Sequence, residues 1–222
     1  MPTTYSASPR APRVRQGGFV LIDSETDAVE RVIAFQYNPE SLSRSIQARG
    51  AGEGGDRAEA LRLTGPPVET ISIEAELDAT DQLEFPRDNP TAVEVGLHAQ
   101  LAALENVLYP SAQSVQQTHD RAQRGELEII PRKASLVLFV WGQDRVVPVV
   151  LSDMSAVEEG FTPDLNPLRV RLSLNMTVLT TSDVGYGSRA AAMYRAYHRN
   201  RERLARQQPQ GAINDLGLEE LP

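Results

Sequence analysis

The chain has no cysteine among its 222 residues, and it has only one tryptophan and one lysine. Without thiols it can form no disulfide, thiolate metal site or thiol nucleophile. No apolar run approaches the ~18 residues of a membrane-spanning helix. The N-terminal segment contains arginines but no apolar stretch typical of a secretory signal. We therefore expect no disulfide scaffold and no direct membrane insertion.

The charge is distributed unevenly. The formal net charge is −8, yet the segment from Arg189 to Arg206 contains six arginines and a single glutamate. An acidic protein lacks the basic field that phosphate binding requires, so we expect no nucleic-acid partner. The basic segment is better suited to docking on an acidic protein surface. A nucleic-acid-binding adaptor is kept as an alternative, and it would show steeply salt-dependent binding.

Alternation of apolar and polar residues predicts β-strands. The clearest strand runs from Val68 to Asp78, with one apolar and one charged face. The stretches Phe19–Ile22 and Val29–Tyr37 flank a turn and predict a β-hairpin. Further extended segments are expected at 42–49, 126–130, 134–141, 146–154 and 168–180.

Two helices are expected. The first runs from Thr91 to Leu108, with Pro90 at its start and a stripe of apolar residues at 3.6-residue spacing. The second runs from Arg189 to Arg206 and is capped by Ser188. The polar stretch 111–125 is interpreted as a loop or a frayed helix, and 49–60 as a mobile loop.

This order of elements predicts a mainly β, α+β fold: a barrel or sandwich with one flanking internal helix and a C-terminal helical extension. Three regions are expected along the chain. They are a flexible N-terminal arm at 1–17, a β domain at 18–181, and a basic helix with a disordered tail at 182–222.

No constellation of residues predicts catalysis. Glu74, Glu76 and Asp78 lie on one face of a strand and could collect a cation, but no histidine is nearby. A solvated face, or a rim that meets a basic partner, explains them better. The three histidines, at 98, 119 and 198, lack the spacing of a zinc helix, and Gly185–Ser188 is explained by a turn before a helix. We expect no enzyme activity, no cofactor and no metal.

The C-terminal helix combines a narrow apolar stripe with a line of arginines. It either packs on its own domain or docks on a neighbouring subunit or partner. The candidate partner-contacting residues of the chain are Arg189, Arg195, Arg199, Arg203, Tyr194, Tyr197, Glu74, Glu76 and Asp78.

The segment from Phe35 to Leu42 reads Phe-Gln-Tyr-Asn-Pro-Glu-Ser-Leu. It is similar to the opening of the contractile-injection-system tube-protein family, which includes baseplate hub proteins of phage-tail-like particles that are often fused to a LysM module. Further short segments similar to the family occur in the same order over residues 18–181. They are Leu63–Pro67, Leu104–Pro110, Phe139–Gly142, Phe161–Pro163 and Pro167–Val170.

The resemblance implies a tube-like β-barrel assembled into a six-membered ring between the inner tube and the spike of a baseplate. It also implies inner tube, spike and baseplate wedge proteins as partners. The implied location is the cytoplasm of a bacterial producer cell, within a particle that is retained or released. The chain departs from the family pattern after Thr181, because residues 182–222 lack the strand–helix pattern of a LysM module.

Besides the nucleic-acid-binding adaptor, three functions thus stay open. The leading one is a ring-forming hub or baseplate subunit that offers an exposed strand edge to its neighbour, with Val68–Asp78 and Leu168–Thr180 as candidate strands of the ring-building sheet. We expect deletion of Arg189 to Pro222 to leave the domain folded but to abolish stable particles. The alternatives are an inner tube subunit and, in another class, a small-molecule-binding β-barrel or hydrolase, for which the sequence offers no pocket of converging polar groups.

Overall fold

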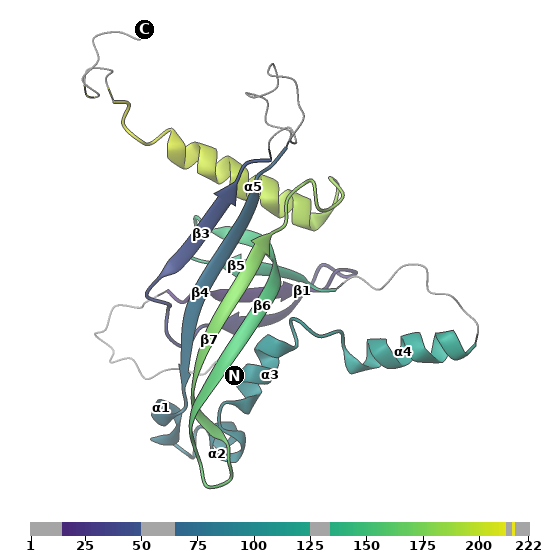
Figure 1. Cartoon of the computed structure of the whole chain (residues 1–222), viewed down its shortest axis with the longest axis vertical. Coiled ribbons are helices and arrows are strands. Elements are labelled where there is room, and N and C mark those ends of the chain that lie inside the picture. Colours follow the sequence, from purple (N-terminus) through teal and green to yellow (C-terminus); the bar gives the residue numbers. More distant parts are fainter. Residues whose placement is uncertain (1–14, 50–64, 125–133, 212–214, 216–222) are drawn as a thin grey trace.

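A computed structural model describes residues 15–49, 65–124, 134–211 and 215. The expected strand at 126–130, most of the arm at 1–17 and most of the loop at 49–60 lie outside the described residues, as does most of the tail. The described chain forms one seven-stranded sheet and five helices (Figure 1). Among these helices none is long and apolar enough to cross a membrane.

The sheet is antiparallel throughout and confirms the mainly β, α+β class. Its strands follow the order β2-β1-β5-β6-β7-β4-β3. Their bounds are Gly18–Ile22 for β1, Val29–Ala34 for β2, Leu42–Gln47 for β3, Val68–Asp78 for β4, Leu136–Val140 for β5, Val146–Phe161 for β6 and Pro167–Val178 for β7. The hairpin β1–β2 and the strand β4 are thereby confirmed, and β4 alternates between a buried and a wet face as its sequence predicts.

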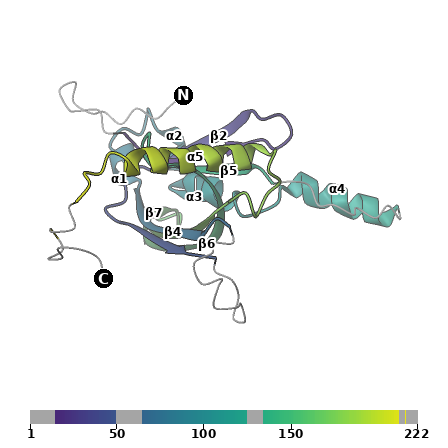
Figure 2. The same cartoon turned by 90° about the horizontal axis from the view of Figure 1, so that it is seen from above.

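The sheet is open, which corrects the expectation of a closed barrel. Strands β2 and β3 are its edges, and no pairing joins them in the described residues. Seen along the long axis, β2 and β5 lie on one side and β4, β6 and β7 on the other, with α3 between them (Figure 2). The sheet therefore curves around its core, and a helix occupies part of the space that barrel closure would fill.

The core contains the inward-facing residues of every strand except the edges β2 and β3. Phe19 packs edge-on against Phe35 with ring centroids 5.5 Å apart, and Phe139 stacks on Trp141 at 6.0 Å. Three leucines of the helical layer, Leu97, Leu101 and Leu104, are also buried. One continuous cluster thus joins both halves of the sheet and the helix.

The expected helix at 91–108 is two helices, α2 (Pro90–Val95) and α3 (His98–Glu105). They are separated by Gly96, whose φ of +55° is disfavoured for other residues. The amide of Leu97 donates to the carbonyl of Pro167 at 3.1 Å instead of continuing the helix. The turn between β6 and β7 thus breaks the helix, and the two ends of the predicted stripe, Val93 and Leu108, are exposed.

Two more internal helices correct the expectation of a single one. A short helix, α1 (Thr80–Leu83), follows β4. The polar stretch after residue 111 forms α4 (Ala112–Gln123), and the Ser111 hydroxyl accepts the amide of Ser114 at 3.1 Å. No residue of α4 is buried, and the helix projects sideways from the body (Figures 1 and 2).

The C-terminal helix α5 (Arg189–Ala205) is confirmed, including its cap. The Ser188 hydroxyl accepts the amide of Ala191 at 3.2 Å, which explains the Gly-Tyr-Gly-Ser turn without any ligand. The helix lies across one end of the sheet (Figure 1), and Tyr194 and Tyr197 on its inner face belong to the core cluster. The helix is therefore packed on its own domain, while the boundary at 181/182 stays a prediction.

Candidate functional site

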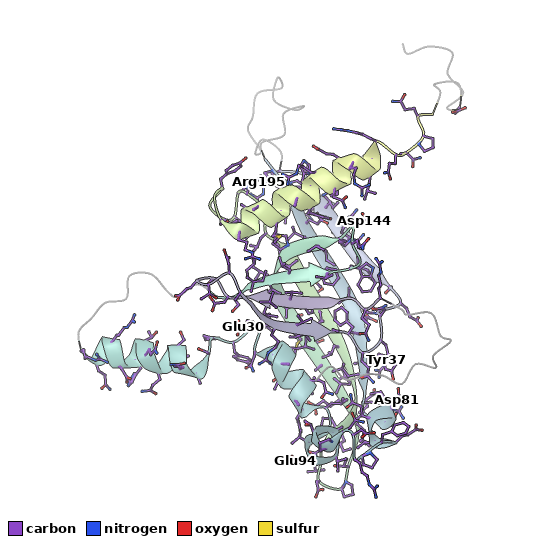
Figure 3. The ribbon with its side chains drawn as sticks, turned by 180° about the vertical axis from the view of Figure 1, so that it is seen from behind. Glu30, Tyr37, Asp81, Glu94, Asp144 and Arg195 are labelled. Atoms are coloured by element: carbon purple, nitrogen blue, oxygen red, sulfur yellow. The ribbon has the colours of Figure 1, made fainter. Side chains whose placement is uncertain are left out.

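The segment that connects β2 to β3 binds several elements together through its side chains. Gln36 donates to the carbonyl of Asp78 at 2.7 Å and accepts the amide of the same residue at 2.9 Å, as a neighbouring strand would. Tyr37 donates its hydroxyl to Asp81 at 2.7 Å (Figure 3). The motif that carries the family resemblance thus has a structural role at the end of β4.

Asn38 in the same segment binds the chain where it enters the fold. Its side-chain amide donates to the carbonyl of Arg15 at 2.8 Å and accepts the amide of Gly17 at 2.8 Å. Partial burial, followed by the nearby Asp81 carboxylate, raises the pKa of Tyr37 to about 12. The hydrogen bonds of Asn38 and the hydrogen bond from Tyr37 to Asp81 hold the segment 36–41 in place beside the outer face of β4, which is the face that carries Glu74 and Glu76.

The three predicted carboxylates lie on this outer face. Glu74 and Glu76 are exposed, and Asp78 is half-buried at the end of the strand. Asp78 lies opposite Arg169 on β7, and its carboxylate is 3.5 Å from the Arg169 guanidinium. Arg171 lies opposite Glu76 but donates to Glu159 of β6. Within the described part of the chain, Glu74 and Glu76 form no ion pair, so they are the available charges of the set.

Two adjoining hollows follow the outer face along β7. One encloses about 730 Å³ between the segment 37–41 and the exposed side chains of β4, β6 and β7. The other encloses about 510 Å³ and extends toward Asp78 and Arg169. They share Tyr37, Glu76 and Arg171, so together they form one open groove, which we call the outer groove. It lacks the apolar enclosure typical of a small-molecule site.

The arginines of α5 are largely satisfied by the chain itself. Arg189 donates to the carbonyl of Asp27 at 2.7 Å, and Arg203 donates to the Asp144 carboxylate at 3.0 Å. Arg195 donates to the carbonyl of Tyr186 at 2.6 Å and lies over its ring; Figure 3 shows Arg195 and Asp144 on this end of the molecule. Arg199 has no ion pair with any described residue and is the predicted arginine most available to a partner.

The two predicted tyrosines of α5 face the core of the domain, on the side of the helix opposite to its exposed arginines. Tyr194 and Tyr197 are 6% and 4% exposed, so neither can reach a partner while α5 is packed. Tyr197 donates its hydroxyl to Glu69 of β4 at 2.9 Å. Burial, followed by the charge of Glu69, raises the pKa of Tyr197.

Glu69 is a buried carboxylate that sequence reasoning missed. It is 2% exposed and is 3.6 Å from the guanidinium of Arg44 and 3.2 Å from that of Arg201. A signal for it exists in the sequence, because Glu69 shares the inward register with Ile71 and Ile73. A carboxylate at such a position needs partners, and here they come from β3 and α5.

The free edges of the sheet are the second feature that sequence reasoning did not locate. β5 pairs with β6 only at Val146–Val149, whereas β7 pairs with it as far as Phe161. In the described structure the opposite edge of β6 is therefore unpaired from Val150 to Phe161. Val150, Val157 and Phe161 on this half-strand are about half exposed. β3 offers a second unpaired edge at the other end of the same four-stranded unit.

The histidines do not converge. His98 begins α3, His119 contacts Gln123 within α4, and His198 lies 3.4 Å from Glu202 on α5. Across the described ranges, no group of three or more histidine, aspartate or glutamate residues is placed to hold a metal ion.

Comparisons with known proteins gave no family. No protein-family model matches the chain, and no curated protein matches it. Two solved structures are similar at 10% identity and a TM-score of 0.28. One is the tail of an empty gene transfer agent particle with C6 symmetry, covering 73% of this chain and 90% of the matched chain. The other is the virion of a native gene transfer agent particle, covering 76% and 95%. At this TM-score neither likeness carries an argument about this chain.

Proposed function

We propose that the chain is a non-enzymatic structural subunit of a phage-tail-like particle, and specifically a ring-forming hub or baseplate subunit of a contractile injection system. The observation that carries the proposal is the four-stranded unit β6-β7-β4-β3, which within the described residues has a different free edge at each end. The motif resemblance at Phe35–Leu42 supplies the class of particle, and inner tube, spike and wedge proteins are the proposed partners in it.

The two free edges have a consequence for symmetry. An unpaired strand edge is a template for pairing with another chain. Because the half-strand 150–161 of β6 and the strand β3 differ, pairing one with the other is heterologous. Such contacts do not stop at two copies but close into a ring or continue as a filament. A hexameric ring is the closed form that we propose, assembled in the cytoplasm of a bacterial producer.

The remaining exposed members of the predicted set fit this arrangement. Glu74 and Glu76 lie on the outer face of the same four-stranded unit, and Arg199 lies on the end that α5 covers. We propose that these residues meet neighbouring proteins above, below or beside the ring. No cofactor or metal is part of the proposal.

The test is the mass in solution by light scattering, with negative-stain images of the same peak. A hexamer of the 24.4 kDa chain has a mass of about 146 kDa. The variant Val150→Lys/Val157→Lys places two charges on the free half of β6, as natural edge strands do, and should reduce the mass to that of a monomer without lowering the melting temperature.

The matched control is Val32→Lys on β2, which is 64% exposed but lies on an edge that the proposed pairing does not use. It should leave the hexamer intact. A hexamer that survives the double substitution on β6 would contradict the edge assignment, and a wild-type monomer would contradict unaided ring formation. Stacks of rings in the images would favour the inner tube subunit over the hub.

A further inference from the structure

The outer groove faces solvent and has a net negative charge, because five carboxylates and two arginines line it. Its floor includes Ser155 and Val157 of β6, which are exposed, Val157 to 54%, and Ser173 of β7, which is half-buried. Glu74 and Glu76 line it, and neither forms an ion pair within the described residues. The two arginines of the groove, Arg169 and Arg171, each pair with another carboxylate. The groove therefore favours an extended, basic occupant.

The chain itself carries such a segment, and it begins beside the groove. Asn38 forms part of the groove wall, and its side chain binds the backbone on both sides of Gln16. Residues 1–14 therefore connect to the described fold at the wall of the groove. This segment contains Arg10 and Arg13 and no acidic residue, and its prolines at 2, 9 and 12 favour an extended backbone.

The lengths agree. The groove follows β7 from Arg169 to Ser173, which is about 13 Å for four steps of 3.3–3.4 Å each. Counted back from Arg15, Arg13 and Arg10 lie at most about 7 Å and 18 Å along an extended chain. An extended arm that starts at the groove wall is therefore long enough to place both guanidinium groups along the groove.

From these observations we infer that the N-terminal arm, residues 1–14, binds in the outer groove of its own chain, with Arg10 and Arg13 facing Glu74 and Glu76. The arm of the same chain is favoured over that of a second copy, because tethering presents it at an effective concentration on the order of millimolar. This inference does not depend on ring formation.

The absence of cysteine makes a direct test possible. The double variant Ala11→Cys/Ser155→Cys of the full chain places one thiol between the two arginines of the arm and one on the groove floor. Treatment with a short bis-maleimide cross-linker should give a product within one chain, in a yield that does not depend on protein concentration. The control Ala11→Cys/Ala122→Cys, with the second thiol on the projecting helix α4, should give little product.

Charge variants test the recognition. Adding Glu74→Gln/Glu76→Gln should lower the cross-linking yield at limiting reagent by about fivefold, the amount expected for two solvent-exposed ion pairs. Glu94→Gln/Glu105→Gln makes the same change of net charge on α2 and α3 and should leave the yield unchanged. Circular dichroism melts check that all variants are folded.

Three outcomes would overturn the inference. The yield could equal that of the control pair, in which case the arm does not occupy the groove. The yield could stay the same in Glu74→Gln/Glu76→Gln, in which case charge does not guide the arm. The product could join two chains, in which case the occupant is the arm of a second copy.

Discussion

Single residues between β2 and β3 explain why the motif at 35–42 is informative. Phe35 belongs to the core, Gln36 pairs with the backbone of Asp78, Tyr37 donates to Asp81 and Asn38 binds the backbone of Arg15 and Gly17. Each of these roles needs a specific side chain, since an amide can both donate and accept and a phenol can bridge to a carboxylate. The side chains of the motif thus join the β2–β3 connection to the end of β4 and to the residues before β1, and these roles are structural.

The raised pKa of Tyr37 gives the first prediction. In the unfolded chain a tyrosine ionises near pH 10, whereas in the fold partial burial and Asp81 raise the pKa of Tyr37 to about 12. The stabilisation is therefore fully present below pH 10 and is lost as the pH rises toward 12. We expect the urea midpoint of the wild type to fall toward that of Tyr37→Phe over this interval. Tyr109→Phe, at a 68% exposed side chain, is the control; a constant difference between wild type and Tyr37→Phe would contradict the assignment.

The buried Glu69 gives the second prediction. Tyr197→Phe removes a hydrogen bond to a buried charge while keeping the ring, and we expect the free energy of unfolding to fall by about 2 kcal/mol. The control is Tyr186→Phe, whose side chain is 70% exposed and whose hydroxyl bonds to no described residue. Urea unfolding measures both. A loss below about 0.5 kcal/mol for Tyr197→Phe would show that Arg44 and Arg201 satisfy the carboxylate without it.

At the scale of elements, the break at Gly96 shows one packed turn reshaping a helix. A Cβ atom at this position would lie 2.7 Å from the carbonyl oxygen of Pro167, in addition to the strain of a positive φ. We predict that Gly96→Ala costs about 3 kcal/mol of unfolding free energy. Gly142→Ala is the matched control: its φ is +76°, but no atom lies within 4 Å of the added Cβ, so only the backbone strain of about 1 kcal/mol is expected. Equal losses would mean that the contact with Pro167 is unimportant.

Strands were more predictable than helices in this chain. Alternation within β4 and β7 is a local property, because each residue faces either the core or water. The break at Gly96 depends on a carbonyl more than 70 residues away, which no local pattern contains. The sequence of α4 is also compatible with a loop or a frayed helix, because it has no apolar stripe for burial, which is the usual signal of a helix. The open sheet likewise depends on pairing between distant strands.

The site shows the same division. The exposure of Glu74 and Glu76 results from the period of two along β4, while their contact with a partner stays a prediction. The burial of Tyr194 and Tyr197 was left open between packing and partner contact, because a narrow apolar stripe fits both. In the described residues the free half of β6 results from β5 being shorter than β7, and the length of a neighbouring strand is not visible in the pattern of β6 itself.

For the whole molecule, the packing of α5 revises the expected effect of truncation. Tyr194 and Tyr197 each bury roughly 150–250 Å², which at about 25 cal/mol per Å² stabilises the fold by roughly 4–6 kcal/mol per side chain. That is on the order of the total stability of a domain. We therefore predict that removing residues 189–222 abolishes cooperative unfolding, measured by near-ultraviolet circular dichroism and thermal melts. Removing only 209–222, which spares α5, should leave the melting temperature unchanged. Equal melting of the two truncations would restore the view of α5 as a separable appendage.

One strand has a mechanical consequence that concerns any assembly built from this subunit. β6 alone belongs to both halves of the sheet, pairing with β5 at its start and with β7 along its length, and its register shifts between Leu151 and Asp153. Within the sheet, a load applied across the strands passes through this strand. The ladder to β7 carries it on many hydrogen bonds, whereas the short ladder to β5 carries it on few. The weaker ladder of the sheet is therefore the junction of β5 with β6, which the core cluster and α5 reinforce.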